Sequence, residues 1–121
     1  MIWKPNTTVA AVIEKDGRFL MVEEETADGI RINQPAGHLE DGETLFDAVR
    51  RETIEETAYE FTPKQLLGVY HWQRTDRDIT YLRFAFIGEL GPHHAGQSLD
   101  QGIIRAVWMN LEELKSSQAI H

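Results

Sequence analysis

The segment that most constrains the fold spans residues 37–59 and reads GHLEDGETLFDAVRRETIEETAY. It begins with a glycine-containing loop and continues as a helical pattern, for which Thr44 is a suitable N-cap. Side chains on one face of a helix lie three and four residues apart. Here that face begins apolar, turns acidic for one turn and ends aromatic, in the order Leu45, Ala48, Val49, Glu52, Glu55, Glu56 and Tyr59. The chain therefore carries carboxylates where the apolar stripe of a helix would otherwise continue.

The acidic turn is unfavourable for the helix by itself. Carboxylates at this spacing repel one another, and the C-terminal half of a helix disfavours negative charge. After this turn, the next lysine or arginine is Lys64. Three glutamates on one helical face are most often simply solvated, and that interpretation stays open. The alternative is a bound divalent cation, and Mg²⁺ suits it because this hard ion prefers oxygen ligands.

The spacing in this segment resembles the signature motif of the Nudix hydrolase family. That motif is a glycine, five residues, a glutamate, seven residues, Arg-Glu, an aliphatic residue, any residue, Glu-Glu, any residue, a glycine and an aliphatic residue. The matching residues stand in register: Gly37, Glu43, Arg51, Glu52, Glu55 and Glu56. Thr53 replaces an aliphatic residue, and Ala58 replaces the second glycine. Since that glycine normally leaves the helix in a left-handed conformation, we expect strain of about 1 kcal/mol at Ala58 or a slightly longer helix.

The resemblance implies hydrolysis of phosphoanhydride bonds with Mg²⁺ or Mn²⁺ as the cofactor. The metal ligands that it implies are Gly37, through its carbonyl oxygen, and the glutamates Glu52, Glu55 and Glu56. One of the three glutamates, Glu52 by the commonest family account, would accept the proton of the attacking water. The sequence does not decide which one does so.

Three more residues of the implied site are Arg51, Glu43 and Asp100. Arg51 and Glu43 would pair and hold the loop against the helix; the alternative is a surface pair of Arg51 with Asp47, worth at most about 0.5 kcal/mol. Many Nudix enzymes supply another acid from a later loop, before a tryptophan-containing strand. In the corresponding stretch, LDQGIIRAVW, the often acidic position is Gly102. The nearest carboxylate, Asp100, either assists the metal or the base, or is a solvated loop acid.

Candidates for substrate binding are His71, Trp72 and Arg83. In the implied fold His71 and Trp72 lie on a strand that faces the site, where stacking on a pyrimidine or nucleobase would contribute roughly 1–3 kcal/mol. Core packing is commoner for a tryptophan in a strand. Arg83 could contact phosphate or form a surface pair. His93-His94 is a less suitable metal pair, because adjacent residues seldom chelate one ion, and a polar loop is expected there.

The pattern of apolar and turn-forming residues predicts the elements of the fold. Strands are predicted at residues 7–13, 19–22, 66–74, 79–90 and 103–109, with a further short strand at 30–32. Turns and loops are predicted at 16–17, 28–29, 34–43, 75–78 and 91–102. Helices are predicted at 45–59 and 111–118, the second with a capping box of Asn110 and Glu113. This order predicts an α/β (α+β) fold, and the resemblance implies a Nudix-type α/β/α sandwich with a mixed β-sheet.

The composition fits a single domain over residues 1–121, with 41% hydrophobic and 26% charged residues. The net charge of −8 argues against binding to nucleic-acid polymers or membrane surfaces, which requires a basic face. There is no apolar run long enough for a membrane span and no signal-peptide pattern, so we expect a cytoplasmic protein. The sequence leaves open whether it is a monomer or a homodimer.

Outside the motif, the stretches KPNTTVAAVIEKDGRFLMVEE, HWQ and LRFAF resemble a subfamily of bacterial Nudix phosphatases. That resemblance implies small-molecule pyrophosphate substrates: nucleoside di- and triphosphates, thiamine pyrophosphate or its phosphorylated pyrimidine precursor. The alternatives are a nucleotide-sugar or dinucleotide pyrophosphatase and, in another class, a non-catalytic Nudix-fold ligand-binding module. Such modules usually lose acids of the motif. Members of the subfamily continue past the position of residue 121, so a shortened chain would lack part of the substrate pocket.

Overall fold

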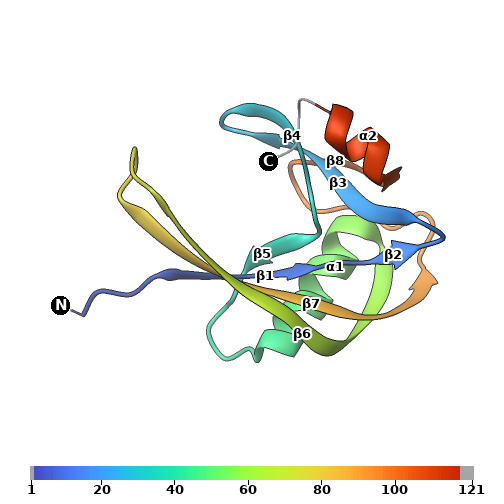
Figure 1. The fold of residues 1–121 in the computed structure, drawn as a ribbon. Helices are drawn as coiled ribbons and strands as arrows, with labels where there is room; N and C mark the ends of the chain where they lie inside the picture. The colour runs from blue at the N-terminus through green and yellow to red at the C-terminus, as the bar shows by residue number, and fades with distance from the viewer. Residues whose placement is uncertain (1, 118–121) are drawn as a thin grey trace.

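The computed structural model describes residues 2–117, and its strands form two four-stranded sheets (Figure 1). The first sheet has the order β5 (Ala36–His38), β1 (Asn6–Ala11), β7 (Ile79–His93) and β6 (Tyr59–Arg74). The second consists of β2 (Glu14–Lys15), β3 (Arg18–Thr26), β4 (Gly29–Asn33) and β8 (Ile103–Asn110). In the first sheet β1 pairs parallel with β7 and antiparallel with β5. The predicted α+β fold with a mixed sheet is confirmed.

Helix α1 (Leu45–Thr57) packs on one face of the first sheet and also contacts β8 of the second. Figure 1 shows it between the two sheets, with α2 (Leu111–Ser116) beside β8. The core joins apolar residues of α1 to those of the first sheet and β3: Val9, Ala11, Ile13, Leu20, Ala48, Val49, Phe61 and Phe86. This packing fixes which face of α1 is turned inward.

Both ends of α1 follow from local chemistry. Thr44 is its N-cap, as predicted, and accepts a hydrogen bond from the Asp47 N–H at 3.1 Å. Ala58 ends the helix in the left-handed region at φ 62° and donates its N–H to the carbonyl of Ile54. The predicted helix end at Tyr59 is therefore two residues too late. Of the two expected outcomes at Ala58, strain is found and lengthening is not.

Several strands differ in extent from the prediction. β6 begins at Tyr59 instead of residue 66 and runs through Pro63, which an edge strand tolerates where its register shifts. β7 continues to His93, so the following loop starts later than residue 91. Strand β5 lies inside the predicted loop 34–43, because pairing with β1 supports a segment too short to be recognised by periodicity. The predicted strand 7–13 ends at Ala11.

The remaining predictions concern the second sheet and α2. Asp16 and Gly17 both have positive φ, as the predicted hairpin turn requires, and β3 on its far side is longer than the expected 19–22. The capping box of Asn110 and Glu113 is present, and α2 ends at Ser116; residue 118 of the predicted helix lies outside the described residues. In residues 2–117, no helix has the length and apolarity to cross a membrane.

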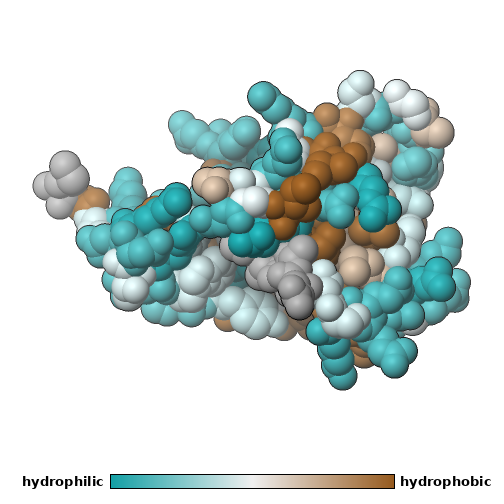
Figure 2. All heavy atoms as spheres, turned by 90° about the horizontal axis from the view of Figure 1, so that it is seen from above, coloured by the Kyte–Doolittle hydropathy of each residue, from teal (hydrophilic) through white to brown (hydrophobic). Residues whose placement is uncertain are grey.

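The surface is predominantly hydrophilic with local apolar areas. Figure 2, seen from above, shows hydrophobic atoms gathered over one part of the molecule with hydrophilic side chains around them. Half-exposed aliphatic residues of the second sheet and α2 are Ile30, Ile104 and Leu111. On the first sheet, edge strand β6 exposes a separate apolar group that includes Leu67, Tyr70 and Trp72.

Candidate active site

Two of the three glutamate side chains in the acidic turn of α1 point into the protein. Glu52 is 9% and Glu56 7% exposed, on the same side of the helix as fully buried Ala48 and Val49. Glu55 is different, with 40% of its side-chain area exposed. The simple solvated-face interpretation is therefore wrong for Glu52 and Glu56. These carboxylates continue the apolar stripe into the interior.

Strand β5 passes very close to these carboxylates. A Cβ atom added to Gly37 would lie 2.2 Å from the carboxyl carbon of Glu52, so the approach requires glycine. The N–H of Ala36 donates to Oε1 of Glu56 at 2.9 Å. One short segment of β5 thus meets both buried glutamates. In the sequence, the loop before α1 and the first half of that helix lie between this segment and the glutamates.

Arg51 joins the loop to the helix, as predicted. Its Nε and Nη2 donate to the two oxygens of Glu43, at 2.6 and 3.0 Å, and its Nη2 also donates to the carbonyl of His38. Its Nη1 donates to Glu52 at 2.6 Å and to Glu55 at 3.4 Å. The alternative pair with Asp47 is not formed, because that side chain closes the capping box with Thr44.

Burial determines the ionisation of the two inward-facing acids. It raises the pKa of Glu56 to about 9. Repulsion from Glu52 and Glu24 adds to this rise, whereas the hydrogen bond from the Ala36 N–H opposes it. Burial also raises the pKa of Glu52, and the hydrogen bond from Arg51 opposes that rise. In contrast, the hydrogen bond from Arg51 lowers the pKa of Glu43. Both buried carboxyls would therefore ionise more readily beside an additional cation.

The oxygen atoms gathered near the acidic turn are of the type that binds a hard cation. Three carboxylates and a peptide carbonyl at Gly37 are oxygen donors of the kind that Mg²⁺ and Mn²⁺ accept. Within residues 2–117, no three acidic or imidazole groups are gathered closely enough to enclose an ion as they stand. Instead Arg51 holds oxygens of Glu52 and Glu55, and the Ala36 N–H holds one of Glu56. The residues fit a metal by type, and side-chain rotations would have to bring the oxygens together.

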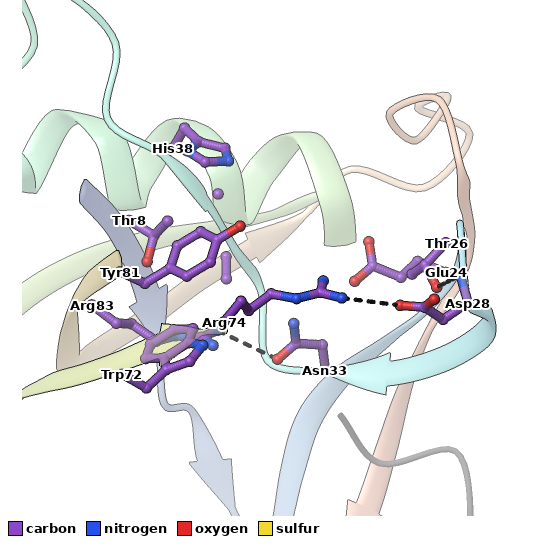
Figure 3. A pocket seen from close by; sticks show the side chains of 12 residues that line it. Thr8, Glu24, Thr26, Asp28, Asn33, His38, Trp72, Arg74, Tyr81 and Arg83 are labelled. Atoms are coloured by element: carbon purple, nitrogen blue, oxygen red, sulfur yellow. Dashed lines mark hydrogen bonds and ion pairs between the residues drawn. The ribbon is translucent and has the colours of Figure 1, made fainter. Parts of the chain in front are cut away.

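A cavity of about 410 Å³ lies beside this cluster, between the two sheets (Figure 3). Both sheets contribute to its walls, together with the β5 segment that meets the glutamates. The lining residues are Thr8, Glu24, Thr26, Asp28, Asn33, Ala36, Gly37, His38, Trp72, Arg74, Tyr81 and Arg83. Two of the three predicted substrate residues, Trp72 and Arg83, thus line the cavity next to the glutamates. The third, His71, is exposed on β6 and is not among the lining residues.

Arg83 is a half-buried cation that forms no ion pair with an acidic side chain of the described residues. Its Nε is buried without a hydrogen-bond partner, and its Nη2 donates to Oδ1 of Asn33 at a long 3.4 Å. Among the described ion pairs, within 4.0 Å, none involves Arg83, so the surface-pair alternative is wrong. Burial lowers the pKa of Arg83, and the charges of Glu56 and Glu24 oppose this. The side chain is suited to an anion that enters the cavity.

Trp72 stacks on Tyr81, with ring centroids 5.0 Å apart and an interplanar angle of 19°. Trp72 keeps 39% exposure and lines the cavity, so it is not a core tryptophan. Sequence reasoning missed Tyr81. Strand alternation could have found it, because Tyr81 and Arg83 are two residues apart and therefore share a face of β7.

Asp100 and the histidine pair His93-His94 lie apart from the lining of this cavity. Asp100 is exposed, but its N–H donates to the Glu55 carbonyl at 2.8 Å, and its charge contributes to the raised pKa of Glu52. The His93 ring packs on the Tyr59 ring, with their centroids 4.4 Å apart. The Nε2 atom of His94 lies 2.7 Å from Oε2 of Glu60. The two adjacent histidines thus contact different groups.

Comparisons with known proteins identify the family and the fold. The family profile of the NUDIX domain matches residues 3–121. The chain is 39% identical over 113 residues to the phosphatase NudJ of Escherichia coli. The matched region covers 93% of this chain and 73% of NudJ. A NUDIX hydrolase structure from Nitrosomonas europaea superimposes with a TM-score of 0.92 at 48% identity, covering 98% of this chain and 80% of the other. A MutT NUDIX hydrolase from Burkholderia pseudomallei, 20% identical, shares the fold with a TM-score of 0.84, covering 98% of this chain and 92% of the other.

Proposed function

The chain belongs to the Nudix hydrolase family, and from that membership we propose that it hydrolyses phosphoanhydride bonds of small pyrophosphates. The substrates are nucleoside di- and triphosphates, thiamine pyrophosphate or its phosphorylated pyrimidine precursor, with Mg²⁺ or Mn²⁺ as the cofactor. One observation carries the proposal. Two buried glutamates meet the Ala36–Gly37 segment at the wall of a cavity in which Arg83 forms no ion pair with any described acidic residue.

The acids of α1 would hold the metal ion. Its ligands are Glu52, Glu55, Glu56 and the carbonyl oxygen of Gly37. When bound, the ion neutralises phosphate charge and makes a bound water easier to deprotonate. Either Glu52 or Glu55 accepts the proton of the attacking water, and Asp100 assists from the adjoining loop.

The other charged residues position these groups. Arg51 fixes the carboxylate of Glu52 and ties it to Glu43, so that the loop before α1 and the acidic turn keep one geometry. Arg83 supplies charge-assisted hydrogen bonds to a phosphate group of the substrate. Trp72 provides an aromatic surface for the organic part. His71, whose side chain does not line the cavity, has no part in this proposal.

A non-catalytic ligand-binding module is less consistent with this arrangement. Burial of Glu52 and Glu56 raises their pKa values, which means that the folded protein disfavours their charged forms. A module that only binds a ligand through Arg83 and Trp72 would not require that cost. Retention of all four acids and Arg51 instead favours catalysis.

The substitution Glu56→Gln tests the proposal. It keeps the size of the side chain but removes a metal carboxylate, so we expect turnover to fall by at least about two orders of magnitude. Phosphate release is measured for a panel of nucleotides and thiamine pyrophosphate with Mg²⁺. The exposed Glu14, on β2, provides a matched control, and Glu14→Gln should retain wild-type turnover. Near-normal turnover of Glu56→Gln at saturating Mg²⁺ would refute the assignment of this residue.

A further inference from the structure

A second cavity, of about 560 Å³, adjoins the first at Trp72 and Arg83, which line both. Its other described lining residues carry no carboxylate and are mostly apolar, with one amide side chain: Val12, Gln34, Leu67, Tyr70 and Ala85. The first cavity, in contrast, includes Glu24 and Asp28 and the segment that meets the catalytic glutamates. The two cavities therefore differ in chemistry, and Arg83 stands at their boundary.

The strand register explains why the cavities are continuous. Across β6 and β7, Trp72 pairs with Tyr81, Tyr70 with Arg83 and Gly68 with Ala85, so these side chains follow one another along one face of the first sheet. The neighbouring residues of opposite orientation, Phe84 and Phe86, pack with the core under α1. The face that α1 leaves uncovered thus runs from the aromatic pair past Arg83 to an apolar surface.

The apolar surface is available for contact. Leu67 and Tyr70 are each 50% exposed. The Tyr70 side chain folds back over Gly68, since a Cβ atom there would lie 3.0 Å from the Tyr70 hydroxyl oxygen. Binding of a flat apolar ligand is favourable here, because it removes the apolar surface of these side chains from water. Among the described lining residues of this cavity, Arg83 is the one cation that could meet a phosphate group.

We propose that the second cavity holds the planar organic group of the substrate, while Arg83 binds the phosphate chain at the boundary and the first cavity receives the phosphates. This inference rests on the proposed function, since it takes the ligand to be a ring linked to a diphosphate. Arg83 requires an anion, and a ligand anchored on it can extend its ring into the apolar cavity while its phosphates lie beside Ala36 and Gly37. The ring then contacts mainly apolar side chains, and Gln34 is the amide that could hydrogen-bond to its edge.

The proposal is tested by binding, which does not depend on turnover. Calorimetry with Mg²⁺ compares two non-hydrolysable ligands: adenosine α,β-methylene diphosphate, which has a ring, and methylene diphosphonate, which has the phosphorus groups alone. Leu67→Ser should weaken binding of the nucleotide analogue by about fivefold or more, because part of a leucine contact is lost. Binding of methylene diphosphonate should stay unchanged. The matched control is Ile104→Ser on β8, which has similar exposure, 46%, and should change neither affinity.

A variant in the first cavity separates the two placements of the ring. His38 lines the first cavity and not the second, and His38→Ala leaves intact the backbone carbonyl that Arg51 uses. Unchanged nucleotide affinity in Leu67→Ser together with a loss in His38→Ala would place the ring in the first cavity and overturn the inference. Absence of nucleotide binding to the wild-type protein would overturn it as well. If wild type binds both ligands as expected but hydrolyses no substrate, the proposed function fails and the ring site stands.

Discussion

At the scale of single residues, the environment of Glu56 decides its charge. Burial raises its pKa from the model-peptide value of 4.5 to about 9. The unfolded chain releases this proton above about pH 4.5, whereas the metal-free folded protein keeps it until about pH 9. Since the unfolded state then binds fewer protons, the free energy of unfolding falls as the pH rises through this window, by at most about 1.4 kcal/mol per pH unit.

The prediction is measured as the melting temperature in EDTA from about pH 5 to about pH 9. Wild type and Glu14→Gln should lose stability as the pH rises. Glu56→Gln, which cannot ionise, should have a flatter profile and should melt at an equal or higher temperature at neutral pH. Parallel profiles of wild type and Glu56→Gln would show that this carboxyl ionises normally in the folded protein.

At the scale of secondary-structure elements, the contact between β5 and α1 depends on Gly37. An alanine Cβ would meet the Glu52 carboxylate, which Arg51 also holds, so the side chain would have to leave its position. Since a displacement of about 1 Å in a catalytic group can reduce the rate by about 10²-fold, we expect Gly37→Ala to lose most of its activity while it remains folded. Activity and melting temperature are measured on the same preparation.

A glycine outside the site provides the control for this element. Gly17, in the β2–β3 turn, has φ +78° with open space around its Cβ position. Gly17→Ala should lose about 1 kcal/mol of stability through left-handed strain and keep its activity. Equal activity of Gly37→Ala and Gly17→Ala would mean that the close approach of β5 to Glu52 has no part in catalysis.

At the scale of the whole molecule, the site should couple metal binding to folding. The unfolded chain does not assemble the glutamates of α1 with Gly37, so Mg²⁺ should stabilise the folded state by about 1.4 kcal/mol when its concentration is ten times Kd. Melting with Mg²⁺ and with EDTA measures this difference, and Glu56→Gln should gain much less. If melting is insensitive to Mg²⁺ and Mn²⁺, even with a non-hydrolysable nucleotide present, the metallohydrolase assignment should be abandoned.

Much of the fold and the pairing of Arg51 with Glu43 could be predicted from the sequence. Helical periodicity, the Thr44 cap and the Asp-Gly turns depend on neighbours within a few residues, so they are visible in a linear pattern. The register of the acidic motif likewise indicated the family. These local signals also gave the correct order of the main strands, although the ends of β6 and β7 were misplaced because pairing between strands extends them.

Tertiary structure alone decided which charged side chains are buried and what they meet. Helical spacing put Glu52, Glu55 and Glu56 on one face, but the sheets bury the first and third and leave Glu55 largely in water. Likewise, only the pairing of β7 with its neighbours places Arg83 on the uncovered face, between two cavities. Within residues 2–117 it forms no ion pair there. Burial and charge compensation depend on groups that are distant in the chain. A local pattern can therefore identify candidate ligands, whereas their electrostatic environment arises only when the sheets and α1 pack together.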